Sequence, residues 1–148
     1  MTDIRRIVLA EDDPNDVELT LGALRAHRIA NEIVVVRDGA EALDYLYRRN
    51  GYASRPDVNP ALLLLDLKMP KVDGLEVLRV VKADARLRTI PIVVLTSSRE
   101  ERDVVRSYDL GVNAYVVKPV HFQEFVDAVK VVGGFWAVLN EPPAGGVV

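Results

Sequence analysis

Hydrophobic residues gather in five short runs rich in Val, Ile and Leu. The runs contain almost no polar residue, whereas a strand with one solvated face alternates apolar and polar positions. Unbroken apolar runs of this kind are typical of parallel strands that helices cover on both faces. The pattern therefore predicts five buried strands, at residues 7–10, 33–36, 62–65, 92–95 and 114–118.

The segments that follow these runs space their apolar residues three and four positions apart, as one face of a helix does. The positions are Val17, Leu21 and Leu24; Leu43, Leu46 and Tyr47; Leu75, Leu78 and Val81; and Phe122, Phe125, Val126 and Val129. A less apolar segment at 99–109 completes the series, and residues 50–60 form a turn-rich loop. Strand and helix thus alternate five times, which predicts an α/β fold with right-handed crossovers.

The composition limits the classes of partner and metal site that this protein can have. The 148 residues suit one domain, with 49% hydrophobic and 28% charged residues. A net charge of −3 gives no reason to expect nucleic acid or an anionic membrane as partner. The absence of cysteine excludes disulfides and thiolate metal sites, and the first apolar run is too short for a signal peptide. We expect a cytoplasmic protein.

Polar residues stand just past the strand ends, where a doubly wound sheet binds its ligands. They are Glu11, Asp12 and Asp13 after the first strand, Asp66 after the third, Thr96 after the fourth, and Lys118 and Pro119 after the fifth. Grouped carboxylates stay ionised together when a cation lies among them. Oxygen ligands without cysteine or a nearby histidine favour Mg²⁺ or Mn²⁺. An aspartate there can also act as a nucleophile that forms an aspartyl phosphate.

Each of these signals has a structural alternative. Asp66 can be a capping carboxylate, and Asp12 or Asp13 before Pro14 fits a helix N-cap with proline at the first helical position. Thr96 can cap a helix, and Lys118 with Pro119 can end a strand in a turn. The functional interpretation is favoured because a fold of this type brings all of these positions to one edge.

The stretches "LAEDD", "LLLLDLKMPKVDG", "VVLTS" and "AYVVKP" together resemble the receiver domain of two-component response regulators, over residues 4–132. The resemblance implies a flavodoxin-like (βα)5 fold with a doubly wound, five-stranded parallel sheet in the order 2-1-3-4-5. It also implies that Asp66 accepts a phosphoryl group from a sensor histidine kinase. Such a protein is a signalling switch that gains and loses its own phosphoryl group, and not a turnover enzyme.

The resemblance also implies roles for the site residues. Asp12 and Asp66 would bind Mg²⁺ directly, Glu11 through water, and Lys68 through its backbone carbonyl. Lys118 would pair with the phosphoryl oxygens. The remaining implied roles are a hydroxyl donor that moves on activation at Thr96, an aromatic switch at Tyr115 and a cis peptide bond before Pro119. Glu11 departs from the family, because many members have Asp there.

Residues 133–148 are predicted to be a tail without a separate output domain, so the chain is similar to stand-alone receivers. The loop at 50–60 and the stretch "FWAVLNEPP" are similar to small receivers that pair with bacterial phytochrome kinases, several of which form dimers. Phe135, Trp136 and Leu139 are therefore candidates for a homodimer or kinase surface, or they fold back onto the core.

Three alternatives belong to other classes. A receiver-like interaction module that is never phosphorylated would be expected to lose the acceptor, the acids or the lysine, and this chain retains them. A haloacid-dehalogenase-type phosphatase is disfavoured because Lys68 stands where its second acid belongs. A nucleotide-binding flavodoxin-like protein is disfavoured because no glycine-rich loop follows the first strand.

Overall fold

The computed structural model describes residues 6–26, 31–96, 110, 112 and 114–131. The elements within these ranges alternate between strand and helix, with a short 3-10 helix, η1, after the second helix. They are β1 (Ile7–Ala10), α1 (Pro14–Arg25), β2 (Ile33–Val36), α2 (Gly39–Tyr47), η1 (Asn50–Tyr52), β3 (Leu62–Asp66), α3 (Gly74–Ala83), β4 (Ile92–Thr96), β5 (Tyr115–Val117) and α5 (Phe122–Val131). The five predicted strands and four of the helices are confirmed. The predicted helix at 99–109 lies outside the described residues, as do Phe135, Trp136 and Leu139 of the tail.

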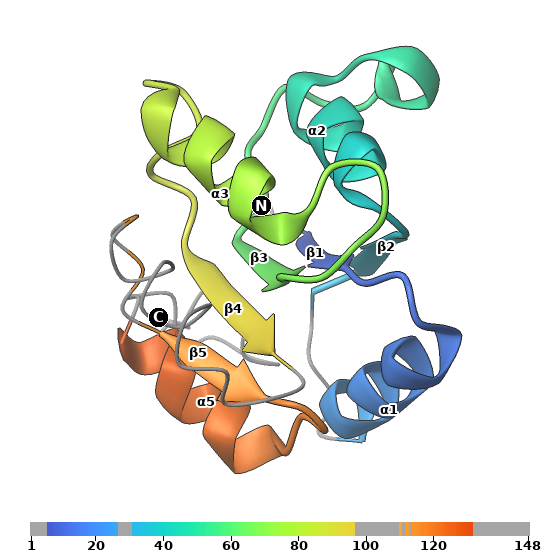
Figure 1. The fold of residues 1–148 in the computed structure, drawn as a ribbon, viewed down its shortest axis with the longest axis vertical. Helices are drawn as coiled ribbons and strands as arrows, with labels where there is room; N and C mark the ends of the chain where they lie inside the picture. The colour runs from blue at the N-terminus through green and yellow to red at the C-terminus, as the bar shows by residue number, and fades with distance from the viewer. Residues whose placement is uncertain (1–5, 27–30, 97–109, 111, 113, 132–148) are drawn as a thin grey trace, which may run out of the picture.

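The strands form one parallel sheet in the order β2-β1-β3-β4-β5 (Figure 1), which confirms the predicted fold class. Residue Ala10 of β1 lies beside Leu65 of β3, and Asp66 lies beside Leu95 of β4. The chain leaves β1 toward β2 on one side and later returns to β3 on the other. The carboxyl ends of β1 and β3 therefore form the switch point, where such sheets bind ligands.

Helices cover both faces of the sheet, with α2 and α3 on one face and α1 and α5 on the other (Figure 1). Alternate residues of each central strand enter opposite cores: Leu63 and Leu65 of β3 pack under α2 and α3, whereas Leu62 and Leu64 pack under α1 and α5. Burial on both faces explains the unbroken apolar runs. In the described ranges, no helix combines the length and apolar character needed to cross a membrane.

One residue of the predicted α2 face is wrong, because Leu43 and Leu46 are buried as predicted but Tyr47 is not. Tyr47 is 37% exposed, whereas Tyr45 is 4% exposed and belongs to the core. The reason lies in the following loop, where the Arg55 guanidinium stacks 4.3 Å over the Tyr45 ring and donates to the Tyr45 carbonyl at 2.6 Å. These contacts cover Tyr45 and bind the loop at 50–60 to the end of α2, a pairing that helical periodicity does not reveal.

Two local features position the site. Asp13 caps α1 by accepting hydrogen bonds from the backbone of Asn15 and Asp16, with Pro14 as the first helical residue, so the cap is Asp13 and not Asp12. Gly74 begins α3 directly against the end of β3, and its backbone N–H donates to Leu67 at 2.8 Å. A Cβ at Gly74 would lie 2.1 Å from the Asp66 carbonyl oxygen, so only glycine fits.

We predict that Gly74→Ala destabilises the protein by about 2 kcal/mol or more, because backbone atoms must move to admit the methyl group. Gly22→Ala is the matched control: Gly22 is exposed inside α1, and a Cβ there meets nothing within 4 Å. That variant should gain about 1 kcal/mol from helix propensity. Urea unfolding measures both, and equal stability of the two variants would contradict the close-contact explanation.

Candidate functional site

The predicted site residues meet at the carboxyl edge of the sheet. Asp66 and Thr96 are the last residues of β3 and β4, Glu11 follows β1, and Lys118 follows β5. Glu11, Asp66 and Thr96 are 0%, 3% and 4% exposed. Glu11, Asp66 and Thr96 stand at the ends of the buried strands β1, β3 and β4. The rigid sheet therefore sets the separations of these three residues.

Lys118 joins the carboxylates. Its Nζ lies 2.8 Å from Glu11 Oε1, 2.9 Å from Asp16 Oδ2 and 3.5 Å from Asp66 Oδ2. The contacts to Glu11 and Asp16 are hydrogen bonds, and the contact to Asp66 is an ion pair at longer range. Its side chain is only 8% exposed, so little water screens these interactions.

Burial raises the pKa of Asp66 to about 7, and the neighbouring Glu11 carboxylate adds to the increase, while Lys118 opposes it. The backbone N–H of Lys68 donates weakly to Asp66 at 3.4 Å, which also favours the charged form. An ionised Asp66 at neutral pH therefore needs further positive charge beside it.

The same contacts act in the opposite direction on Lys118. Burial alone would lower its pKa, but the hydrogen bonds to Glu11 and Asp16 and the charge of Asp66 raise it well above its usual range. Lys118 is therefore a permanent cation of this edge.

Glu11, Asp12 and Asp66 could hold a metal ion, because each offers a carboxylate oxygen and these oxygens lie within 4.8 Å of one another. All are hard oxygen ligands, which suit Mg²⁺ and Mn²⁺. The raised pKa of Asp66 is an independent sign that the cluster lacks positive charge without a cation. The residues present therefore fit a divalent metal ion.

The other predicted residues lie around this centre. Thr96 accepts a backbone hydrogen bond from Lys118 at 2.7 Å, which joins the ends of β4 and β5. Tyr115 is 41% exposed on β5. The peptide bond between Lys118 and Pro119 is cis, as the resemblance implied. The metal contact of the Lys68 carbonyl stays a prediction.

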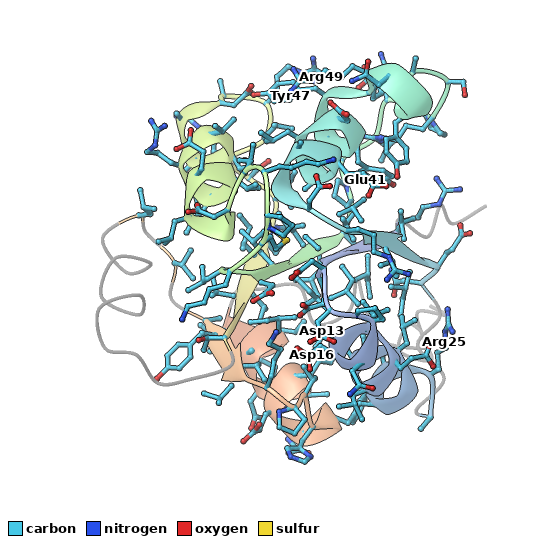
Figure 2. All side chains as sticks on the ribbon, turned by 45° about the vertical axis from the view of Figure 1, so that its right-hand side comes forward. Asp13, Asp16, Arg25, Glu41, Tyr47 and Arg49 are labelled. Carbon is cyan, nitrogen blue, oxygen red and sulfur yellow. The ribbon has the colours of Figure 1, made fainter. Side chains whose placement is uncertain are left out.

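Sequence reasoning missed Asp16, which binds Lys118 as closely as Glu11 does. The predicted site residues stand just past the strand ends, whereas Asp16 lies in the first turn of α1. Figure 2 labels Asp13 and Asp16 at the start of that helix. An acid in the first turn of a helix is ordinarily explained by the helix dipole. The one sequence signal for Asp16 is that α1 already has Asp13 as its cap, so a second acid is not needed for capping.

Comparison with protein families matches residues 7–130 to the response regulator receiver domain. The chain belongs to this family. Receiver domains bind divalent metal, in agreement with the acidic cluster of Glu11, Asp12 and Asp66.

Two relatives of this receiver are the response regulators Rcp1 and RcpA. Response regulator Rcp1 of Synechocystis sp. is 39% identical over 93% of this chain and 92% of its own. The structure of its Mn²⁺-bound form has a TM-score of 0.72 and 40% identity over 88% of this chain and 90% of that one. The phosphorylated cyanobacterial phytochrome response regulator RcpA has a TM-score of 0.74 and 42% identity, over 90% of this chain and 94% of that one.

A third relative is more similar in sequence. The bacteriophytochrome response regulator AtBRR is 61% identical, with a TM-score of 0.88, over 95% of this chain and 100% of its own. Stand-alone phytochrome-associated response regulators are therefore close homologues of this receiver.

We predict that Asp66→Asn stabilises the metal-free protein above neutral pH. The folded-state pKa of Asp66, about 7, lies above its usual value of 3.8, so ionisation costs folding free energy as pH rises through this window. The gain should be absent below about pH 4 and reach at most about 4 kcal/mol above pH 8.

Unfolding in urea across this pH range measures the effect. Glu18→Gln, which removes an exposed carboxylate from α1, is the control for net charge. Saturating Mg²⁺ should stabilise the wild type and narrow its difference from Asp66→Asn. A difference between Asp66→Asn and the wild type that is constant from pH 4 to pH 8 would contradict the burial of an uncompensated carboxylate.

Proposed function

We propose that this receiver is a stand-alone response regulator that takes a phosphoryl group onto Asp66 from a sensor histidine kinase, with Mg²⁺ bound. The main support is the surroundings of the buried Asp66 carboxylate at the end of β3. The Lys118 ammonium lies 3.5 Å away, and Glu11 and Asp12 are close enough to share a metal ion with Asp66. A capping or purely structural aspartate requires neither.

In the proposed reaction an ionised Asp66 oxygen attacks phosphorus. The bond from phosphorus to the donor's leaving atom breaks, and the donor departs with that electron pair; with acetyl phosphate the products are acetate and an acyl phosphate on Asp66. A Mg²⁺ ion, when bound, supplies charge for the phosphoryl oxygens and favours the ionised acceptor. Glu11 and Asp12 would hold the metal with Asp66, and Lys118 would pair with the phosphoryl oxygens. Thr96 would donate its hydroxyl to them.

Three related structures support the finer parts of this proposal. A Mn²⁺-bound form of Rcp1 supports the metal, and phosphorylated RcpA supports the chemistry. The bacteriophytochrome regulator AtBRR supports a phytochrome-type kinase as the phosphodonor. We propose that the protein acts in the cytoplasm and is a switch that resets by hydrolysis, not a turnover enzyme.

The output of this switch is proposed to be binding. An acyl phosphate adds between one and two negative charges at the buried edge, and Thr96 and Tyr115 stand on the adjacent strands β4 and β5. We propose that their rearrangement alters self-association into a homodimer or contact with a protein partner.

Incubation with acetyl phosphate and Mg²⁺ should add one phosphoryl group to the wild type by intact-mass spectrometry. Asp66→Asn should gain none, because the nucleophile is gone, and chelation of the metal should suppress the adduct at least tenfold. Glu18→Gln keeps the site and should react like the wild type.

Phosphorylation of Asp66→Asn to the wild-type level would place the acceptor elsewhere. If no variant gains an adduct and beryllofluoride with Mg²⁺ also fails to bind to the wild type, the alternative of an interaction module that is never phosphorylated is favoured.

A second measurement addresses the output. Sedimentation velocity with Mg²⁺ and beryllofluoride, which mimics the phosphoryl group on a carboxylate, should shift the monomer–dimer balance of the wild type and leave Asp66→Asn unchanged. If the wild type sediments identically with and without beryllofluoride at every protein concentration, self-association is overturned as the output. Binding of another protein then remains.

A further inference from the structure

Asp16 stands outside the strand ends yet contacts the central cation of the site. Its Oδ2 accepts a hydrogen bond from Lys118 Nζ at 2.9 Å, whereas Nζ lies 3.5 Å from the acceptor Asp66. Asp16 belongs to α1, so this contact reaches from a helix on one face of the sheet to the end of β5. The ammonium is held more closely by the helix than by the acceptor.

The three N–H groups of the lysine explain why this matters. Glu11 takes one at 2.8 Å and Asp16 takes a second at 2.9 Å. One N–H remains, whereas a phosphoryl group on Asp66 carries several oxygens that need donors. A second hydrogen bond from the ammonium to that group would have to come from the N–H that Asp16 accepts. Glu11 is buried at the sheet edge and cannot be displaced easily, whereas the Asp16 side chain is 27% exposed and can be solvated.

Charge acts in the same direction. Asp16 adds a negative side chain to an edge that already holds Glu11, Asp12 and Asp66, and it touches the cation that would balance the phosphoryl group. An anion that binds on Asp66 therefore meets repulsion from Asp16 as well as a partly neutralised lysine.

Ordinary helix-start roles leave this contact unexplained. Asp13 already caps α1 by accepting from the backbone of Asn15 and Asp16. An acid in the first turn needs only to face solvent to interact with the helix dipole. The side chain of Asp16 instead reaches an ammonium group that is almost fully buried.

We propose that Asp16 is a positioning residue that restrains Lys118 in the unphosphorylated protein and so opposes occupancy of Asp66 by a phosphoryl group. This proposal rests on the proposed function. On phosphorylation, Lys118 turns from Asp16 to the phosphoryl oxygens, and Asp16 is released to solvent. The contact thereby couples the start of α1 to the state of the acceptor.

The test is the affinity for beryllofluoride, titrated at saturating Mg²⁺ so that a change in metal affinity does not enter. Asp16→Asn keeps the shape of the side chain but removes its charge. It should bind beryllofluoride roughly fivefold more tightly, the lower end of a typical coupling between two sites. Asp16→Glu keeps the charge on a longer arm and should return toward the wild type.

Glu18→Gln removes an exposed acid from the same helix and should bind beryllofluoride as the wild type does. The NMR chemical shift of Lys118 Cε should change when beryllofluoride binds to the wild type. In Asp16→Asn without beryllofluoride, this chemical shift should already differ from that of the free wild type. If Asp16 had a purely structural role, Asp16→Asn would change neither the beryllofluoride affinity nor the Lys118 chemical shift in this specific way.

Unchanged or weaker beryllofluoride binding by folded Asp16→Asn, while the wild type binds, overturns the inference about Asp16 alone. Failure of the wild type itself to bind overturns the proposed phosphoacceptor function, and the inference with it. An equal gain in Glu18→Gln would show a general charge effect and also overturn the specific role of Asp16.

Discussion

The acidic edge of this receiver depends on one buried ammonium group. Glu11 and Asp66 are almost completely removed from water, and burial together with the charge of Glu11 raises the pKa of Asp66. Lys118 compensates part of that charge through contacts of 2.8 Å with Glu11 and 3.5 Å with Asp66. The remaining deficit, visible in the raised pKa of Asp66, is what a divalent ion supplies.

The sheet makes this unfavourable arrangement durable. Glu11 directly follows β1 and Asp66 ends β3, two strands whose residues are all buried, so the cost of grouping these charges is offset by apolar burial nearby. Gly74 serves the arrangement by letting α3 begin against the carbonyl of Asp66, where a side chain would have forced the strand end away.

Asp16 links the edge to a helix. The strand ends supply Asp66 and the neighbouring acids and lysine, but the first turn of α1 contributes Asp16, which forms an ion pair with Lys118. A site whose lysine is shared with a helix can alter that helix when the lysine changes partner, which is the kind of two-state contact on which a switch depends.

The linear pattern determined much of this protein by itself. Unbroken apolar runs such as residues 62–65 predict buried parallel strands, and the acids, hydroxyl and lysine that follow them predict the site. The strand order came from the family resemblance, because periodicity does not say which strands are neighbours. Only the tertiary structure decided that Tyr45 and not Tyr47 enters the core, since Arg55 from the following loop covers it. It also decided that Asp16 shares Lys118 with Glu11, because Asp16 and Lys118 are 102 residues apart and meet only when α1 packs beside the end of β5.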